Sequence, residues 1–378
     1  MNLNFSEEQL MLKEQIQKFC ESDYDFYKRE DVVKSEKDFD ENVWNLFAEQ
    51  GWLSMPFSEE SGGFGFGAIE LSILFEEFGK ALVIEPYLST VVLSGYILDK
   101  STYSKKLEII ESICTGTMHV SLAYAESSNN YDYLNPVTNI SADNILNGTK
   151  ALVLNGANAS KIIVSAISES GFTLAIVDSN QEGVSITSFP TVDGQSCAEV
   201  SFENVALCDD SIIAQGDEAK DLLLNSINLA TLCVSAEAVG CMTSCYLKTV
   251  EYTKGREQFD QPISNFQVLQ HRMVDMFIES ELCKSLLFKA MLEVDSGSDD
   301  MHKHVSALKA QIGKSGKFSA QQAVQLHGGM GVSDELMIGH YLKKMLTIDA
   351  LFGNSCLLYT SDAADDTPCV DLGGRRII

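Results

Sequence analysis

The spacing of apolar residues changes twice along this chain of 378 residues, and that change constrains the fold more than any single motif. Up to residue 116, apolar side chains recur at helical spacing, most clearly in 68–82 and 91–98. From 117 to 215 the period becomes two, and from 216 the helical period returns. We therefore predict an α+β protein with an N-terminal helical domain (1–116), a central small β domain (117–215) and a C-terminal helical bundle (216–355).

Short capping and turn motifs mark the expected ends of several elements. Phe5-Ser6-Glu7-Glu8-Gln9-Leu10 combines a capping box with a hydrophobic staple and predicts the start of a helix. Ser264-Asn265-Phe266-Gln267 has the same capping pattern ahead of a helix over 266–294. In the β domain, Asn147-Gly148 and Asn155-Gly156 are strong signals for hairpin turns.

Composition excludes several classes of protein. The hydrophobic content of 45% and charged content of 21% are ordinary for a soluble protein, and no uninterrupted apolar run reaches the ~18 residues that a membrane span requires. The first residues, 1–6, lack basic side chains ahead of an apolar stretch, so we expect no signal peptide and a cytoplasmic location. A net charge of −27 repels nucleic acid and anionic lipid, and we expect neither as a partner.

The ten cysteines are scattered and include no Cys-x-x-Cys pair, so we expect reduced thiols and no metal site. Cys241 and Cys245 stand four residues apart on a predicted helix and could bind a metal together. Because their helix is apolar, packing is the favoured interpretation of both side chains.

The segment 356–378 differs from the rest of the chain. It shows no helical or strand period, and its residues match the translation of an adapter used in sequencing libraries. Arginines precede it at Arg29, Arg256 and Arg272 and occur within it at Arg375 and Arg376. We expect this segment to be foreign and the C-terminal domain to be truncated near Ser355, the alternative being a genuine disordered tail.

Two segments of the C-terminal region contain residues that could carry chemistry. Arg256-Glu-Gln-Phe259 contains an arginine, whose planar group can grip phosphate oxygens with two hydrogen bonds. Gln325-Leu-His-Gly-Gly-Met-Gly331 contains glycines, which let a ligand approach the backbone because they lack a Cβ atom. The alternatives are a solvated arginine at a helix end and a simple helix-terminating loop.

Together with 51–56, 202–205 and 251–275, these segments make the chain from about Asn4 to Asn354 resemble the acyl-CoA dehydrogenases. Members of that family oxidise the α,β carbon–carbon bond of an acyl-CoA thioester and transfer a hydride to FAD. The resemblance implies the order of helical, β and helical domains that the periodicity also predicts.

The resemblance implies that several residues bind the cofactor FAD. Arg256 and Phe259 would reach the FAD diphosphate of a neighbouring subunit, and the second segment would approach the adenosine side with Gln325, Gly328 and Gly329. His327 would pack or support these residues, with no metal role.

In the β domain the resemblance implies flavin contacts from the segments that contain Glu126 and Asn155. Family members usually have Thr-Glu-Pro where this chain has Ala125-Glu126-Ser127, and Trp and Thr where it has Leu152 and Leu154. Several side-chain contacts to the flavin ring are therefore absent, although backbone N–H groups could still bind it.

The resemblance leaves the catalytic residue unknown. Many members have a glutamate base just before a glycine near the C-terminus, and that place is Phe352 here. Others use a glutamate on an earlier helix, where we align Ala230, followed by Thr231 in place of the usual arginine. Neither phenylalanine nor alanine can accept a proton, and Glu237 nearby is more typical of a structural carboxylate.

Within the family, the chain is similar to small subunits labelled pimeloyl-CoA dehydrogenase, through 24–26, 266–271 and 324–329. The resemblance implies an FAD-dependent subunit acting on an acyl-CoA substrate, in a dimer of dimers with itself or a large dehydrogenase subunit, with a flavoprotein as electron acceptor. Two alternatives stay open: a flavin monooxygenase or oxidase of the same fold, and a non-catalytic structural subunit.

Overall fold

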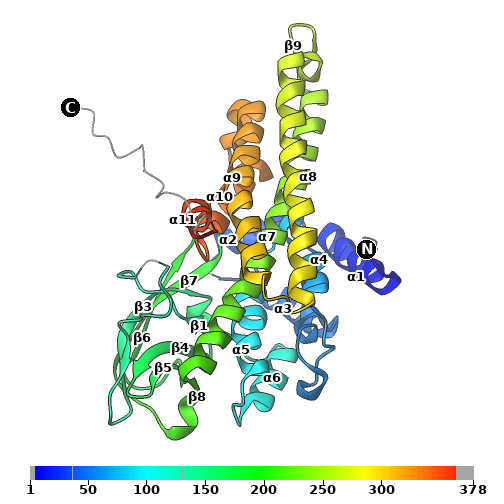
Figure 1. Cartoon of the computed structure of the whole chain (residues 1–378). Coiled ribbons are helices and arrows are strands. Elements are labelled where there is room, and N and C mark those ends of the chain that lie inside the picture. The colour runs from blue at the N-terminus through cyan, green and yellow to red at the C-terminus, as the bar shows by residue number, and fades with distance from the viewer. Residues whose placement is uncertain (1–4, 36, 130, 363–378) are drawn as a thin grey trace, which may run out of the picture. The chain divides into compact units, whose positions relative to one another are not determined.

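The computed structural model describes residues 5–35, 37–129 and 131–362. They fall into two compact units, divided between Glu237 and Ala238, inside the long helix α7 (Gly216–Gly255). The first unit contains helices and a sheet formed by the middle of the chain, and the second consists mainly of helices, which confirms the predicted α+β class (Figure 1).

The first unit opens with a helical part. Its helices are α1 (Glu7–Ser22), α2 (Phe26–Lys34), α3 (Glu41–Glu49), α4 (Ala68–Ala81), α5 (Gly95–Lys100) and α6 (Lys106–Cys114), with short 3₁₀ turns η1 (Trp52–Ser54) and η2 (Glu59–Ser61). The predicted capping box of α1 is confirmed, because Ser6 Oγ accepts the N–H of Gln9 at 3.2 Å and Gln9 Oε1 accepts the N–H of Ser6 at 2.9 Å. A π-helix, η3 (Leu88–Ser94), runs directly into α5.

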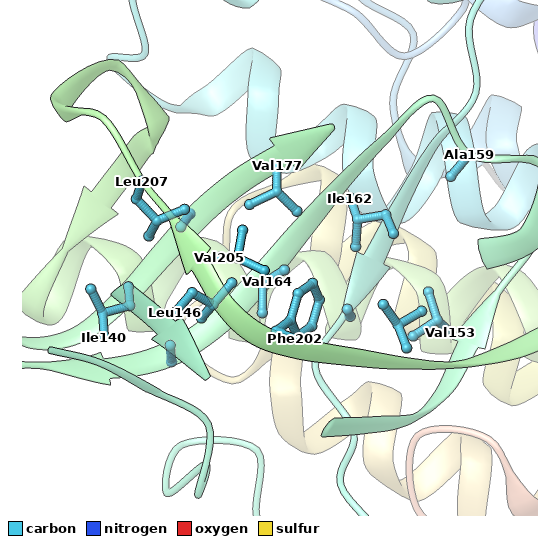
Figure 2. Packing of buried hydrophobic residues seen from close by; sticks show 14 of the residues in the cluster. Ile140, Leu146, Val153, Ala159, Ile162, Val164, Val177, Phe202, Val205 and Leu207 are labelled. Atoms are coloured by element: carbon cyan, nitrogen blue, oxygen red, sulfur yellow. The ribbon is translucent and has the colours of Figure 1, made fainter. Parts of the chain in front are cut away.

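The β part of the first unit is one mixed sheet. Its strands are β1 (Val120–Ala123), β2 (Asn139–Ile140), β3 (Ile145–Leu154), β4 (Lys161–Ser168), β5 (Gly171–Asp178), β6 (Val184–Pro190), β7 (Ser196–Ala206) and β8 (Ile212–Gln215). They lie in the order β6-β7-β3-β2-β4-β5-β8, with β1 parallel to β4. Figure 2 shows the apolar core of this part, where Val164, Phe202 and Val205 lie close together from strands distant in sequence.

The two predicted hairpin turns are wrong. Asn147 and Gly148 lie inside β3, at a register shift between β3 and β7. Asn155 and Gly156 do form a turn, with Asn155 in the left-handed conformation (φ 54°), but this turn leads from β3 to β4, which are not paired. In both places the dipeptide gives a local backbone conformation without deciding which strands pair.

The second unit contains the end of α7 and the helices that follow it. The 3₁₀ turns there are η6 (Ile263–Asn265) and η7 (Gly328–Val332), and the larger helices are α8 (Gln267–Asp295), α9 (Met301–His327), α10 (Met337–Ala350) and α11 (Ser355–Asp362). A small hairpin, β9 (Glu257–Gln258) and β10 (Gln261–Pro262), joins α7 to α8 and lies at the tip of the helix pair (Figure 1). The capping box predicted at Ser264 is wrong, because the N-cap of α8 is Phe266, two residues later, and it has no side-chain cap.

Two further findings bear on sequence predictions. Residues 356–362 belong to α11, although the sequence there shows no helical period; 363–378, the rest of the segment expected to be foreign, lie outside the described residues. Helix α7 is long and apolar enough to cross a membrane, with a mean hydropathy of 1.5 over 18 residues. Of that stretch 83% is buried in the protein, as is typical of the core helix of a soluble protein.

Candidate functional site

The Arg256 segment forms an exposed turn in the second unit. Arg256 follows the last residue of α7, and Phe259 and Asp260 both have positive φ (54° and 60°) at the tip of the β9–β10 hairpin. The side chain of Phe259 is 85% exposed and makes an edge contact with Phe266, with ring centroids 6.0 Å apart. Among the described residues, the Arg256 guanidinium has no hydrogen bond or ion pair, so its donors are available to a ligand.

The glycine segment lies where α9 ends. Gln325 is exposed in the last turn of α9, and Gly328 ends the helix with φ 60° and ψ −134°. A Cβ atom built on Gly328 or Gly329 would have open space around it, so the glycines keep this surface free of side chains for an incoming group. By contrast, a Cβ on Gly331 would come within 2.6 Å of the Val324 carbonyl oxygen, so that glycine is needed for packing.

An aromatic contact brings the two segments together inside the second unit. Tyr252, one turn before Arg256 in α7, stacks on the imidazole of His327, with centroids 4.1 Å apart and planes 25° apart. Its hydroxyl also donates to the His327 carbonyl at 3.4 Å. Burial lowers the pKa of His327, and a hydrogen bond with the Ala323 carbonyl at 2.9 Å opposes that fall. The exposed arginine and the open glycines are thus on one rigid support, which fits a ligand that has phosphate groups.

Phe352 lies in a strained loop after α10. It is 6% exposed and has a φ of 58°, which is rare for a residue other than glycine. The buried amine of Lys309 holds this loop by donating to the Gly353 carbonyl at 2.8 Å and to the Asp349 carbonyl at 3.2 Å. Burial lowers the pKa of Lys309 to about 8, although the charge of Asp349 opposes that shift. The place that a base occupies in many family members is therefore apolar here and fixed in shape.

The second expected base position is equally apolar. Ala230 is fully buried in the part of α7 that belongs to the first unit. The hydroxyl of the adjacent Thr231 donates to the Ile227 carbonyl at 2.7 Å, within its own helix. Glu237 is buried at the last position of the same unit. Neither expected base position offers a proton acceptor.

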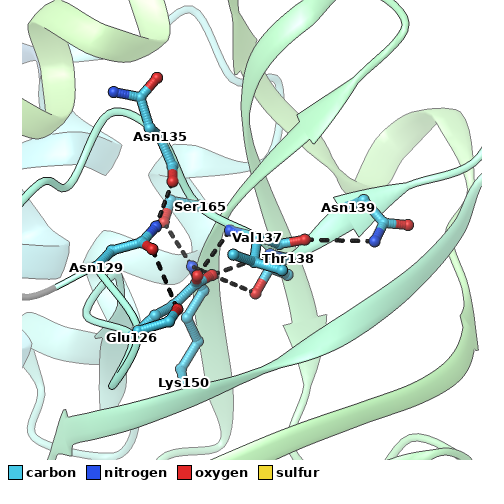
Figure 3. Close-up of polar contacts among 9 residues, drawn as sticks. Glu126, Asn129, Asn135, Val137, Thr138, Asn139, Lys150 and Ser165 are labelled. Atoms are coloured by element: carbon cyan, nitrogen blue, oxygen red, sulfur yellow. Dashed lines mark hydrogen bonds and ion pairs between the residues drawn. The ribbon is translucent and has the colours of Figure 1, made fainter.

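In the β domain, Glu126 belongs to a buried ion pair that the sequence did not predict (Figure 3). Its carboxylate accepts hydrogen bonds from Lys150 Nζ at 2.8 Å, from the N–H and hydroxyl of Thr138 at 3.0 and 2.6 Å, and from the Val137 N–H at 2.6 Å. Lys150, with no exposed surface, also donates to Ser165 Oγ at 3.0 Å. These bonds involve both carboxylate oxygens of Glu126, whose side chain is buried.

The two charges of this pair stabilise one another. Burial would raise the pKa of Glu126, but hydrogen bonds from Lys150, Thr138 and Val137 outweigh it and hold the pKa below its ordinary value. Burial lowers the pKa of Lys150 to about 8, against the hydrogen bond and charge of Glu126. Both groups are therefore ionised at neutral pH.

Asn155, the other β-domain candidate, is 4% exposed and adjoins the buried side chain of Leu154. Its Oδ1 accepts a hydrogen bond from Asn158 Nδ2 at 2.8 Å, and its Nδ2 has no partner among the described protein groups. No cluster of three His, Cys, Asp or Glu side chains in the described part of the chain could hold a metal ion. Cys241 and Cys245 are both buried within α7.

Three profiles of one protein family match nearly the whole chain. They are described as acyl-CoA dehydrogenase, N-terminal domain (residues 6–117), middle domain (121–205) and C-terminal domain (221–358). The chain has the three-part fold of this class of enzyme, and it belongs to the acyl-CoA dehydrogenase family.

Individual relatives are distant but cover most of the chain. A probable acyl-CoA dehydrogenase, YngJ, of Bacillus subtilis is 25% identical over 358 residues, 91% of this chain and 93% of the relative. Mitochondrial isovaleryl-CoA dehydrogenase of Solanum tuberosum is 25% identical over 318 residues, 80% of this chain and 77% of the relative.

Solved structures share the fold. A chain of the ChsE4–ChsE5 complex from Mycobacterium tuberculosis is 23% identical with a TM-score of 0.88, covering 98% of this chain and all of that one. PigA with FAD and proline is 23% identical with a TM-score of 0.89, over 96% of this chain and 98% of that one. The prolyl acyl carrier protein oxidase AnaB is 19% identical with a TM-score of 0.87, over 96% and 99%.

Proposed function

We propose that this chain is an FAD-binding subunit of a hetero-oligomeric acyl-CoA dehydrogenase and that a partner chain contributes the proton-abstracting glutamate. One observation carries the proposal: the two segments suited to FAD are kept and joined by the Tyr252–His327 stack, while Phe352 and Ala230 occupy both expected base positions. In a chain that had lost all function, selection would not preserve the two segments suited to FAD. A dehydrogenase that works alone would need a base at position 352 or 230.

The residues of this chain would bind and orient the cofactor. Arg256 would grip diphosphate oxygens, while the open backbone at Gly328 and Gly329 would admit the adenosine side. When bound, FAD accepts the hydride that leaves the β carbon of the acyl group. The α-proton would pass to a carboxylate of the partner, and the electrons would then leave to an acceptor flavoprotein.

An apolar surface of the second unit supports the existence of a partner. Val274, Ile278 and Leu282 are spaced four residues apart on α8, so they form one stripe, and they are 52%, 47% and 50% exposed. Leu247 on α7 is half exposed as well. Exposed apolar stripes of this kind are typical of surfaces that another chain covers. Solved chains of the same fold occur in the ChsE4–ChsE5 complex, which supports a hetero-oligomer over an isolated subunit.

We further propose that the chain is the smaller subunit of such a pair, as the resemblance to subunits labelled pimeloyl-CoA dehydrogenase implies. The acyl chain of the substrate is left open, because the label describes a group of sequences and no side chain described here selects a chain length.

The visible absorption spectrum of the purified chain, alone and after mixing with candidate partner chains, tests the proposal. We expect a flavin spectrum in at least the mixed sample and bleaching of that spectrum by acyl-CoA. Bleaching should disappear when glutamate is replaced by glutamine in the partner's base position. A colourless mixture, or bleaching that survives this replacement, would contradict the proposal.

An oxidase of the same fold is the second candidate, since it needs no α-proton base at either position. The shared fold with chains titled PigA and prolyl acyl carrier protein oxidase AnaB supports this alternative. Oxygen consumption by the flavin-loaded chain alone, without any partner, would favour it over the first proposal.

A further inference from the structure

A small cavity lined by polar and apolar residues lies in the first unit, and neither Glu126 nor Lys150 lines it. It has a volume of about 20 Å³ and is lined by residues from three places: Glu85 just before η3, Leu154 and Asn155 at the end of β3, and Ser196 at the start of β7. Asp38, from the segment between α2 and α3, completes one side. None of the functional predictions from the sequence involves Glu85.

Several polar atoms on this cavity have no partner in the protein. They are both carboxylate oxygens of Glu85, Nδ2 of Asn155 and Oγ of Ser196, all buried. The hydroxyl of Tyr24 and nearby backbone N–H groups lie close to the carboxylate but do not make hydrogen bonds of normal geometry with it. Leaving even one such group unsatisfied costs about 1–3 kcal/mol, so three in one cavity point to a molecule that all of them bind.

These side chains cannot simply turn toward other partners. Asn158 Nδ2 donates both to Asn155 Oδ1 at 2.8 Å and to Asp38 Oδ2 at 2.7 Å, which leaves the Asn155 amide nitrogen facing away from them. The Asn155 N–H donates to the Ser196 carbonyl at 2.9 Å, so the two residues keep a fixed separation. The polar groups are therefore held in place.

Buried Arg29 holds two segments that lead into the lining of this cavity, two residues before Ile84 and two residues before Gln195. Its Nε donates to the Leu82 carbonyl at 2.9 Å, and its Nη2 donates to the Asp193 carbonyl at 2.7 Å. The Tyr24 hydroxyl accepts the N–H of Ile84 at 3.1 Å, next to Glu85. Such support is typical of a built binding site, because the cost of ordering these groups is met before a ligand arrives.

We propose that one water molecule binds in this cavity between Glu85, Asn155 and Ser196, and that Glu85 takes up and releases a proton through it. A volume of about 20 Å³ holds roughly one water, which needs two to four polar partners. In the exchange, the water transfers a proton to the Glu85 carboxylate while it receives one from a hydronium ion of the solvent, and the reverse transfer releases the proton again. No charge remains on the water, and no oxidant or reductant is consumed.

The surroundings favour protonation of Glu85 near neutral pH. Burial raises the pKa of Glu85 to about 7, because desolvation outweighs the nearby Tyr24 hydroxyl and backbone N–H groups. The titratable and charged groups around it are Cys20 and Tyr24 near the end of α1, Arg29 on α2, Asp38, and Asp193 near Gln195. Burial also raises the pKa of Cys20 and Tyr24, which keeps both neutral, so Arg29 and the two aspartates are the charged neighbours.

The location gives the proton site functional interest. π-Helices such as η3, which begins three residues after Glu85, occur often at functional sites. Leu154 and Asn155, on the opposite wall, belong to the segment expected beside a flavin. The chain would thus have a proton-exchanging carboxyl of its own, although both expected base positions lack one.

Infrared difference spectroscopy of the full chain, titrated through pH 7, tests the proposal. We expect the carbonyl stretch of a protonated carboxylic acid to appear as the pH falls, with a midpoint near 7. Glu85→Gln should abolish this signal. The matched control is Glu77→Gln, which removes another buried carboxyl, one that accepts a hydrogen bond from Lys80 at 2.7 Å, and should retain the signal.

Ser196→Ala keeps the test decisive if Glu85→Gln does not fold. Loss of its hydroxyl weakens the binding of the water that solvates the Glu85 carboxylate, so the midpoint should rise. A crystal structure of the unaltered chain should show one water bonded to Glu85, Asn155 and Ser196. The proposal fails if the signal survives in Glu85→Gln, if the midpoint is unchanged in Ser196→Ala, or if the cavity contains no ordered water. Since neither flavin nor acyl-CoA is needed, these results are independent of the proposed dehydrogenase function.

Discussion

The aromatic ring of Tyr252 stacks on the imidazole of His327, with ring centroids 4.1 Å apart. This contact joins α7, four residues before Arg256, to the last residue of α9, next to Gly328. Two segments about 70 residues apart in sequence therefore keep a fixed relation within one unit. The affinity for a ligand that contacts both segments should therefore depend on Tyr252 and His327, even if neither side chain contacts that ligand.

Replacing Tyr252 with alanine should weaken FAD binding about 10-fold. An aromatic pair contributes about 0.5–1.5 kcal/mol beyond its buried area, and its loss would free the two segments to move apart. Tyr252→Phe keeps the ring but removes the 3.4 Å hydrogen bond to the His327 carbonyl, and should bind FAD nearly as well as the unaltered chain. Titration of flavin-free protein, with its partner where required, measures both. Equal affinity in Tyr252→Ala would show that the segments are held in some other way.

Arg256→Ala should weaken FAD binding by about 10- to 100-fold without changing stability. A charge-assisted hydrogen bond contributes about 1.5–3 kcal/mol, and the exposed guanidinium bonds no described residue whose loss would unfold the chain. The control is Lys254→Ala, two residues earlier, which removes an exposed ion pair with Glu251 and should leave affinity unchanged. If both variants bind FAD alike, the arginine has no role at the diphosphate.

Lys150→Met should destabilise the chain by about 3–5 kcal/mol, because the Glu126 carboxylate would stay buried without its charged partner. Adding Glu126→Gln should restore part of that stability, since the remaining group is then uncharged. Urea unfolding of the two single variants and the double variant measures this coupling. Additive effects of the two substitutions would contradict an ion pair.

Acid should weaken the same region. The folded-state pKa of Glu126 lies below its unfolded value, so its stabilising contribution is present above the unfolded value and is lost as the pH falls through the folded one. Glu126→Gln should therefore show a smaller loss of stability in acid than the unaltered chain. Unfolding midpoints measured at a series of acidic pH values would reveal the difference.

Glu85 should make the stability of the folded chain depend on pH in the opposite direction. Its folded-state pKa is raised to about 7, so the unfolded state loses its proton first and stability falls as the pH rises from about 4.5 to 7. The effect is on the order of 3 kcal/mol for this shift. Glu85→Gln should remove that fall and be relatively more stable at neutral pH, whereas Glu60→Gln, an exposed control, should follow the unaltered chain. If the stability of Glu85→Gln and of the unaltered chain changed with pH in the same way, the prediction would be wrong.

Apolar periodicity was sufficient to predict the class of fold and the positions of the long helices. It works because burial of one helix face or one strand face is a local requirement. The same local reasoning succeeded at Ser6, where a capping box forms as predicted, and failed at Ser264, where a 3₁₀ turn over Ile263–Asn265 displaces the start of α8. The order of the strands could not be predicted, because pairing such as β3 with β7 depends on contacts far apart in sequence.

Some residues of the candidate site could likewise be predicted from the sequence, and others could not. The Arg256 and Gln325 segments could be found because they match segments of the acyl-CoA dehydrogenase family, and their residue types suit phosphate and close backbone approach. Lys150 could not, since a lysine in a strand gives no sign that folding will bring it to Glu126 and Ser165. Tyr252 could have been found from its position one helical turn before Arg256, but nothing in the sequence pairs it with His327.

The π-helix η3 has a consequence for how this chain can vary. Each residue of an α-helix advances the direction of its side chains by about 100°, and a π-helix advances it by less. Deleting one residue from η3 would therefore rotate everything after it, and the buried side chains of Ile97 and Leu98 would turn away from the core. Glu85 precedes this segment, and its first residues, Leu88 and Ser89, line the cavity, so the length of η3 fixes the rotation of α5 relative to the cavity. Insertions and deletions there should therefore be selected against as strongly as in the middle of a strand.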